Sequence, residues 1–256
     1  SSMPIMINQG SRFMPQNLLI LGGTTEASSL AHLISKTNLK ATISYAGRVE
    51  RISQQPIPKR IGGFGGATGL ASYILAERIT HLVDATHPFA AQMSENAIAA
   101  SKMTGIPLIA LTRPPWQPKA GDNWHQVSDI THAVSFLSQE PLRVMLAIGR
   151  MHLAAFYDNQ QHFYLLRLVD LPKTPPLFSN QIIEVARGPF TAAQDAALLS
   201  HHKINLIVAK NAGGSGSYAK IEAARQLGIH VLMIKRPVIR NRQELYNLGD
   251  VIDWLG

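Results

Sequence analysis

The chain has 256 residues, of which 46% are hydrophobic and 16% are charged. This composition supports a sizeable core, argues against intrinsic disorder and leaves room for two domains of ordinary size. The formal net charge of +8 indicates an anionic partner, and the absence of cysteine excludes disulfides, thiolate metal ligands and cysteine nucleophiles. No apolar run reaches the length of a membrane span and no hydrophobic signal core opens the chain, so we expect a soluble cytoplasmic protein.

Residues 18–21 are predicted to form a short apolar strand that breaks at a glycine pair and runs into a helix. Gly22 and Gly23 let the backbone approach a ligand closely, and the N–H groups at the helix start face an anion such as a pyrophosphate. Thr24 or Thr25 would cap the helix or donate a hydroxyl to a phosphate oxygen. The G-x-G-x-x-G fingerprint is absent, so a dinucleotide-binding loop and a tight turn without a ligand both fit this stretch.

The second predicted strand, residues 40–44, ends without an acidic side chain. In NAD-binding domains an acid at this point usually binds the ribose hydroxyls, but no Asp or Glu lies between Glu26 and Glu50. Arg48 could bind the extra phosphate of NADP, or it could be a solvated loop residue. The missing acid favours NADPH, with NADH as the alternative.

Four glycines surround one aromatic residue at positions 62–66. Glycine tolerates the backbone angles that let a loop wrap closely around a ligand. We therefore expect Gly63 and Phe64 to face a ligand. The alternative is a flexible turn ahead of the helix predicted at 67–78.

The third predicted strand, residues 81–85, ends in a cluster of Asp84, Thr86 and His87. Open α/β sheets bind ligands at this end of their strands, so we expect the cluster to line a cofactor site. His87 could act as an acid or base, although a hydrogen-bonding or shape role is more common for such a histidine.

Strands alternate with helices up to residue 113, which predicts a parallel sheet. Three prolines within residues 114–118 then form a stiff connector. We place the domain boundary here, with residues 1–115 as a cofactor-binding domain and residues 116–256 as a substrate domain.

The second half repeats the alternation of strands and helices. Strands are predicted at residues 143–148, 163–169, 182–186, 205–209 and 231–234, and helices near residues 151–156, 191–200, 218–227 and 243–254. Basic residues follow four of these strands: Arg150, Arg187, Lys210 and Arg236. If the strands are parallel, these cations share one edge of the sheet and suit a ligand with several carboxylates, although basic residues at strand ends can also serve solubility alone.

The stretch from Lys210 onward is glycine-rich, follows a strand and opens a helix. Its N–H groups can form a second anion site, and the Lys210 ammonium could donate a proton or bind an anion. Four further residues of this stretch are predicted to contact the substrate: Asn211, Gly213, Gly214 and Tyr218.

Several familiar chemistries are not indicated. The chain has no P-loop, no G-x-S-x-G elbow and no tyrosine–lysine pair of the short-chain dehydrogenase type. Its ten histidines are scattered, so we assign no metal. Aromatic residues make up 7% of the chain and do not alternate with basic runs, which argues against nucleic-acid binding.

Taken together, these stretches resemble the precorrin-6A reductase family of cobalamin biosynthesis. The segments that carry the resemblance run from Ile20 to Arg236 and are ILGGTTEA, SYAGR, GGFGG, DATHPFA with MSENA, LTRPPW, IGRMHLAAF, RGPF and KNAGGSGSYAKIEAAR. The order of DATHPFA and KNAGG makes the match fairly specific.

The resemblance implies an α/β protein with two Rossmann-like domains, parallel sheets and a nicotinamide cofactor in a cleft between them. It also implies hydride transfer from the cofactor to a double bond, between carbons 18 and 19, of a polycarboxylate tetrapyrrole. Some members of the family act on a cobalt-containing intermediate and are associated with NADH.

On this reading Lys210 orients the substrate or delivers a proton, and Arg150, Arg187 and Arg236 bind carboxylates. The protein would be a monomer by default. A two-lobed binding protein without catalysis and a basic nucleic-acid-binding protein are the alternatives.

Overall fold

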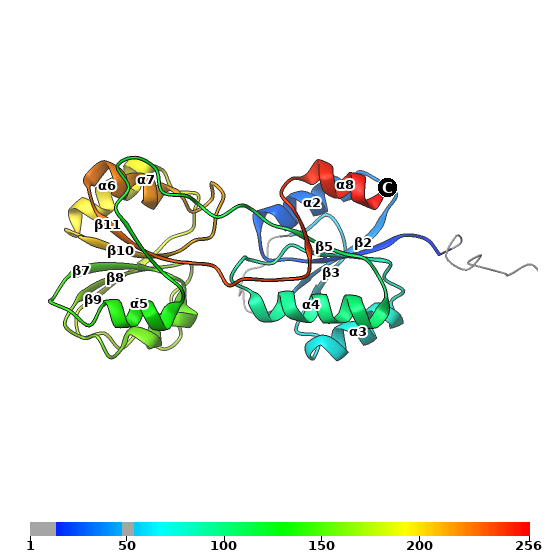
Figure 1. Cartoon of the computed structure of the whole chain (residues 1–256), viewed down its shortest axis with the longest axis horizontal. Helices are drawn as coiled ribbons and strands as arrows, with labels where there is room; N and C mark the ends of the chain where they lie inside the picture. Colours follow the sequence, from blue (N-terminus) through cyan, green and yellow to red (C-terminus); the bar gives the residue numbers. More distant parts are fainter. Residues whose placement is uncertain (1–13, 48–53) are drawn as a thin grey trace, which may run out of the picture. The chain divides into compact units, whose positions relative to one another are not determined.

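The computed structural model describes residues 14–47 and 54–256 (Figure 1). The chain divides into two compact units, Ser1–Thr112 with Val238–Gly256, and Arg113–Pro237. This division differs from the predicted one at residue 115, because the C-terminal segment returns to the first unit and adds a strand and a helix to it.

The first unit is built on a six-stranded sheet in the order β12-β5-β4-β1-β2-β3. Every hydrogen-bonded pair of strands in it is parallel. This is the Rossmann order, with the direction of winding reversing between β1 and β4. The strands are β1 (Asn17–Leu21), β2 (Lys40–Tyr45), β3 (Lys59–Ile61), β4 (His81–Asp84), β5 (Leu108–Leu111) and β12 (Gln243–Leu245).

Helices cover both faces of this sheet, with α2 and α8 on one face and α3 and α4 on the other (Figure 1). The sheet interior is apolar because strands covered on both sides need continuous hydrophobic runs, and all five residues of β1 are buried. The helices are α2 (Thr25–Ser35), α3 (Gly66–Ala76), α4 (Ala91–Thr104) and α8 (Leu248–Leu255).

The second unit has its own six-stranded sheet in the order β6-β11-β10-β7-β8-β9. Its strand pairs are also all parallel, and the winding reverses between β7 and β10. The strands are β6 (Trp124–Val127), β7 (Arg143–Ala147), β8 (Phe163–Leu168), β9 (Gln181–Val185), β10 (Leu206–Lys210) and β11 (His230–Ile234).

In this unit α6 and α7 lie on one face of the sheet, and α5 lies with the 3-10 helix η1 on the other (Figure 1). These elements are α5 (Ile130–Phe136), α6 (Ala192–His201), α7 (Ala219–Leu227) and η1 (Arg150–Phe156). Two parallel α/β units confirm the predicted fold class.

The strand predictions are confirmed within one or two residues, whereas one short strand was missed and two helix predictions need correction. The short strand β3 was not predicted. The helix predicted from residue 243 begins only at Leu248, because residues 243–245 pair with β5 as an edge strand. The helix predicted at 151–156 is the 3-10 helix η1.

Gly69 makes the closest backbone approach in the first unit. A Cβ atom built on it would lie 1.7 Å from the carbonyl oxygen of Phe64, in the glycine-rich loop that precedes α3. Since neither backbone can yield cheaply, Gly69→Ala is expected to lower the free energy of unfolding by about 1–3 kcal/mol. Denaturant unfolding measures this.

Gly63→Ala is the matched control for Gly69→Ala. Gly63 lies in the loop before α3, next to Phe64, and a Cβ atom at this position meets nothing within 4 Å. The control variant should keep the stability of the parent protein. Equal stability of the two variants would show that the Phe64 backbone shifts cheaply to admit a methyl group on Gly69 in α3.

Candidate active site

The loop after β1 lies at the point where the winding of the first sheet reverses. Gly22 is packed tightly, because a Cβ atom there would come within 3.0–3.1 Å of the side chains of Ile43 and Tyr45. Gly23 has a φ of +126° and open space around its Cα, which favours glycine for conformational reasons alone. The loop therefore brings bare backbone to the C-terminal edge of the sheet.

Thr24 joins the two loops that flank this reversal. Its hydroxyl accepts from the N–H of Ala27 at 3.2 Å, which caps α2, and donates to the carbonyl oxygen of Ala85 at 2.7 Å. The predicted cap is therefore confirmed for Thr24, and its hydroxyl proton is used inside the protein. Thr25 is exposed, with its hydroxyl 3.4 Å from a Glu26 carboxylate oxygen.

Asp84 is buried at the end of β4, with a side chain 1% exposed. One carboxylate oxygen accepts from the hydroxyl and the N–H of Thr86, at 2.6 and 3.1 Å. The other accepts from the Ser94 hydroxyl at 2.6 Å and from Arg242 at 3.0 Å. These contacts give Asp84 and Thr86 a structural role, in which they fix the loop after β4 and anchor the returning C-terminal segment.

His87 is half-buried in the same loop. Its Nδ1 accepts from the N–H of Phe89 at 3.2 Å, so a neutral ring carries its proton on Nε2. This contact matches the hydrogen-bonding role expected for this residue.

Arg60 organises the glycine-rich loop, and sequence reasoning gave it no role. Its guanidinium donates to the carbonyl oxygens of Gly62 and Gly63, at 2.6 and 3.1 Å, and lies 3.8 Å from the ring centre of Phe64. Phe64 also packs edge-on against Tyr73 and joins the core under α3, whereas Gly63 is exposed. Arg60 and the packing of Phe64 against the core thus hold the loop in place, and the backbone at Gly63 is exposed.

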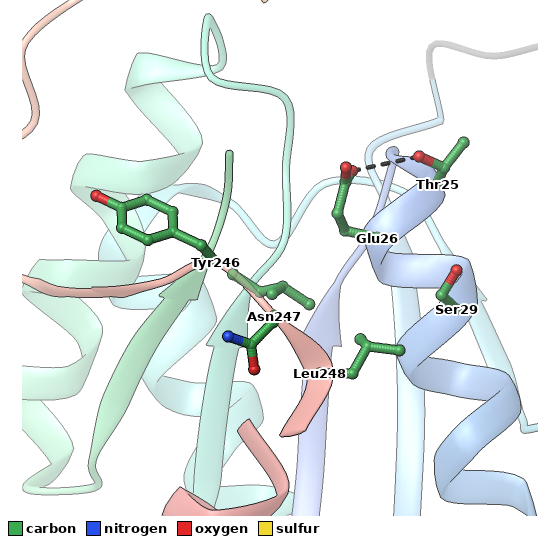
Figure 2. Close-up of a pocket in the computed structure, with 7 residues that line it drawn as sticks. Thr25, Glu26, Ser29, Tyr246, Asn247 and Leu248 are labelled. Carbon is green, nitrogen blue, oxygen red and sulfur yellow. Dashed lines mark hydrogen bonds between the residues drawn. The ribbon is translucent and has the colours of Figure 1, made fainter. Parts of the chain in front are cut away.

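A cavity of about 170 Å³ opens beside the first turns of α2 (Figure 2). Thr25, Glu26 and Ser29 form one wall, and Leu111 contributes the end of β5. The opposite wall consists of Tyr246 and Asn247, in the turn between β12 and α8, and Leu248, the first residue of α8. Its volume is below the usual range of ligand sites, so it suits one part of a larger ligand. The sequence gave no signal for it because its walls lie far apart in the chain.

The second unit carries its predicted cations at one edge, since β7, β9, β10 and β11 run parallel. Arg150 and Arg187 are exposed there, and Arg187 lies 3.5 Å from Asp170. Arg236 is half-buried and donates to the carbonyl oxygen of Arg113 at 2.6 Å. Binding of a substrate carboxylate by Arg236, as predicted, would thus compete with this internal hydrogen bond.

The start of the glycine-rich stretch after β10 is held by Trp116. The buried Asn211 side chain accepts from the Trp116 N–H at 2.7 Å and donates to its carbonyl oxygen at 3.0 Å. The indole N–H donates to the carbonyl oxygen of Gly214 at 2.7 Å, and a Cβ atom on Gly213 would lie 2.3 Å from the Pro114 carbonyl oxygen. These groups shape the loop, so their predicted substrate contacts stay predictions.

Tyr218, at the start of α7, packs its ring 5.5 Å from that of Trp116 and accepts a hydrogen bond from Arg225. Its hydroxyl therefore has an internal partner. Its predicted contact with the substrate also stays a prediction.

Lys210 ends β10 beside the reversal of the second sheet, and burial lowers its pKa from the usual 10.5. His152 of η1 lies near it, since burial and then the charge of Lys210 lower the pKa of this histidine below its usual 6.5. Both groups therefore give up a proton more readily than their solvent-exposed counterparts do. Sequence reasoning missed His152, because the only signal was its place just after β7.

Lys220 is a buried lysine of the same unit, 7% exposed. Its ammonium donates to the Ser217 carbonyl oxygen at 2.6 Å and lies 5.5 Å from the centre of the Trp116 ring. Burial and the charges of Arg167 and Lys210, partly offset by Asp195, lower its pKa to about 8. Burying this charge therefore costs stability at neutral pH.

Lys220 predicts a specific dependence of stability on pH. Its folded pKa of about 8 lies below the usual 10.5, so between these values the unfolded chain binds more protons and the free energy of unfolding rises with pH. From pH 7 to 10 the parent protein should gain up to about 3 kcal/mol relative to Lys220→Met. Urea unfolding at both pH values measures it. The exposed Lys173→Met is the control, and an identical pH dependence of parent and Lys220→Met would refute the prediction.

Neither a metal cluster nor a membrane-crossing helix is found in the described part of the chain. No three His, Asp or Glu side chains converge within residues 14–47 and 54–256. The helices of these same residues are each too short or too polar to cross a bilayer.

Comparisons with known proteins cover nearly the whole chain. The family model described as Precorrin-6x reductase CbiJ/CobK matches residues 17–256. The chain is 50% identical over 238 residues to the precorrin-6A reductase of Rhodobacter capsulatus, which covers 93% of this chain and 95% of that protein. It is 51% identical over 221 residues to the precorrin-6A reductase of Sinorhizobium sp., which covers 86% and 84%. A solved structure of CobK precorrin-6A reductase matches with a TM-score of 0.89 at 50% identity, over 94% of this chain and 96% of that one.

Proposed function

The chain belongs to the precorrin-6A reductase family, and on this premise we propose that it reduces one carbon–carbon double bond of precorrin-6A with NADPH. One carbon of the bond gains a hydride and its neighbour gains a proton, so NADPH and one proton are consumed per product. The similarity to precorrin-6A reductases is the main support for the proposal. It covers both units, and so includes the Rossmann sheet of the first and the cationic edge of the second.

The first unit fits a nicotinamide dinucleotide. Dinucleotides bind where the winding of such a sheet reverses, and Gly22 and Gly23 bring bare backbone to that point in front of the N-terminus of α2. Gly63 and Thr25, both exposed, would bind from the flanking loop and the helix. When bound, NADPH supplies the hydride.

The cavity beside α2 suits the nicotinamide end of the cofactor. The adenosine ribose of such cofactors lies at the end of the second strand, so the other mononucleotide belongs to the half of the sheet formed by β4, β5 and β12. Leu111, Tyr246 and Leu248 would contact the ring, and the carboxylate of Glu26 would accept a hydrogen bond from its amide or ribose.

NADPH is preferred in this proposal over NADH. The residues described at the end of β2, Tyr45 to Gly47, include no carboxylate to bind ribose hydroxyls. Arg48, predicted to bind the 2′-phosphate, lies outside the described residues.

Arg48→Ala tests this preference. The variant should lose affinity for NADPH by about ten-fold, the scale of one charge-assisted contact, while its affinity for NADH stays unchanged. Fluorescence titration with each cofactor measures both constants. An unchanged ratio of the two would remove Arg48 from the 2′-phosphate site.

The substrate groups are held at the cationic edge of the second unit in this proposal. Arg150 and Arg187 are exposed and suit carboxylates, and Lys210 donates the proton to the carbon next to the one that accepts hydride. The relatives at 50% and 51% identity are named precorrin-6A reductases, which favours the metal-free substrate. The monomeric state and the cytoplasmic location belong to the proposal as well.

The direct test combines purified protein, precorrin-6A and NADPH. NADPH absorbance should fall in step with a product that is heavier by one hydride and one proton in mass spectrometry. A cobalt-bearing substrate and NADH serve as the comparison arms. Tight binding of the tetrapyrrole without any NADPH consumption would favour a binding protein instead.

A further inference from the structure

Exposed apolar side chains gather where β7, β8 and β9 end. Met151 is 65% exposed, Val169 53%, Leu171 67% and Val185 49%. A group of exposed large apolar side chains at one place on a domain marks an interaction site. We call these four residues the apolar patch.

The strand pairing places the ends of β7, β8 and β9 side by side. Strands β7, β8 and β9 are consecutive parallel neighbours, and Leu168 pairs with Val185 at the end of the β8–β9 ladder. Neighbouring strands lie about 4.8 Å apart, so the three strand ends span about 10 Å. The ion pair of Asp170 with Arg187, at 3.5 Å, links the two loops that follow β8 and β9.

Cations border the patch on both sides. Arg150 directly precedes Met151, Arg187 follows β9, and Lys210 ends β10, which pairs with β7. An apolar area flanked by exposed guanidinium groups is complementary to a flat apolar body with carboxylates at its periphery. The end of β11 differs, because Arg236 there donates to the backbone of Arg113 and Asn211.

We propose that the apolar patch is the surface on which the substrate macrocycle lies, with Arg150 and Arg187 binding its carboxylates. This inference rests on the proposed function, from which it takes the substrate. It places the substrate over the β7–β9 half of the edge and away from the end of β11. Asp170 holds Arg187 beside the patch before the substrate arrives.

The test compares two leucines of one loop. Leu171 lies just after the C-terminal end of β8. Leu177 is also exposed, at 69%, but its carbonyl oxygen accepts a hydrogen bond from Gln160, which precedes β8. Leu177 therefore lies toward the N-terminal ends of the strands, away from the apolar patch. Leu171→Gln is expected to raise the KM for precorrin-6A about ten-fold, with little change in kcat or in the KM for NADPH. Leu177→Gln is expected to behave as the parent protein.

A second measurement separates this inference from the proposed function. Tetrapyrrole binding followed by the absorbance of the macrocycle, without NADPH, should weaken in Leu171→Gln and in Met151→Gln even if no reduction occurs. Equal binding by Leu171→Gln and the parent protein would overturn the inference. So would an equal loss in Leu177→Gln, or a change from dimer to monomer in Leu171→Gln, because the patch would then be a contact between copies of the chain.

Discussion

Arg242→Met is expected to lower the free energy of unfolding by about 3–5 kcal/mol, because it leaves a buried carboxylate without its cation. The Arg242 side chain is 7% exposed and contacts Asp84 at 3.0 Å and the Ser94 hydroxyl at 3.2 Å. It also lies 3.2 Å from Glu244, which is more exposed. The variant should also loosen β12 and α8 from the rest of the first unit. Denaturant unfolding measures the loss of stability, and hydrogen exchange at β4 and β12 measures the loosening.

Two further variants sharpen this prediction. Arg240→Met changes an exposed arginine of the same segment and should leave stability unchanged. Arg242→Met combined with Asp84→Leu removes both charges and should recover part of the lost stability, since the penalty lies in the orphaned charge. If the double variant loses as much free energy of unfolding as Arg242→Met and Asp84→Leu lose in total when each is made alone, the ion pair is not the source of the effect.

This network shows where sequence reasoning reached its limit. The position of Asp84 at the end of a buried strand was predicted, and the structure has it there. Its partner lies 158 residues further along the chain, in a segment that was predicted to belong to the other domain. Local patterns predict which residues reach the edge of a sheet, but they do not tell which of those residues are buried against a distant segment.

The same limit applies to the second unit. The spacing of basic residues after strands predicted a cationic edge, and parallel pairing confirms that the strand ends share it. The chain alone did not separate exposed Arg150 and Arg187 from Arg236, whose partner Arg113 is 123 residues away. Asn211 and Trp116, 95 residues apart, are a second such pair. The periodicity of apolar residues predicts where a strand or helix lies. The role of a polar side chain, in contrast, depends on contacts with distant segments that only the fold defines.

Thr24 and Thr25 show the limit at a single turn. Both were equal candidates for the cap, because adjacent threonines at a helix start carry the same chemistry. The hydroxyl of Thr24 reaches Ala85 only because β4 lies beside β1 in this sheet. That neighbour relation leaves Thr25 as the exposed hydroxyl at the start of α2.

Lys210→Met is expected to lower the kcat for precorrin-6A by about 10²–10⁴-fold, the usual contribution of a positioned proton donor. The affinity for NADPH and the free energy of unfolding should change little, since NADPH is assigned to the other unit. Lys210→Arg keeps the charge but donates a proton poorly, so it should retain substrate binding while kcat stays low. Lys235→Met, an exposed lysine after β11, is the matched control and should turn over normally.

The pH profile distinguishes proton donation from mere anion binding. A donor must be protonated, and burial lowers the pKa of Lys210, so the kcat of the parent protein should fall as pH rises through a value below 10.5. Because His152 has its pKa lowered by burial and by Lys210, it is uncharged at neutral pH and adds no basic limb to the profile. Lys210→Met should lose that fall in kcat. If Lys210→Met instead raises the KM for precorrin-6A at unchanged kcat and keeps the pH profile, Lys210 binds a carboxylate and the proton comes from elsewhere.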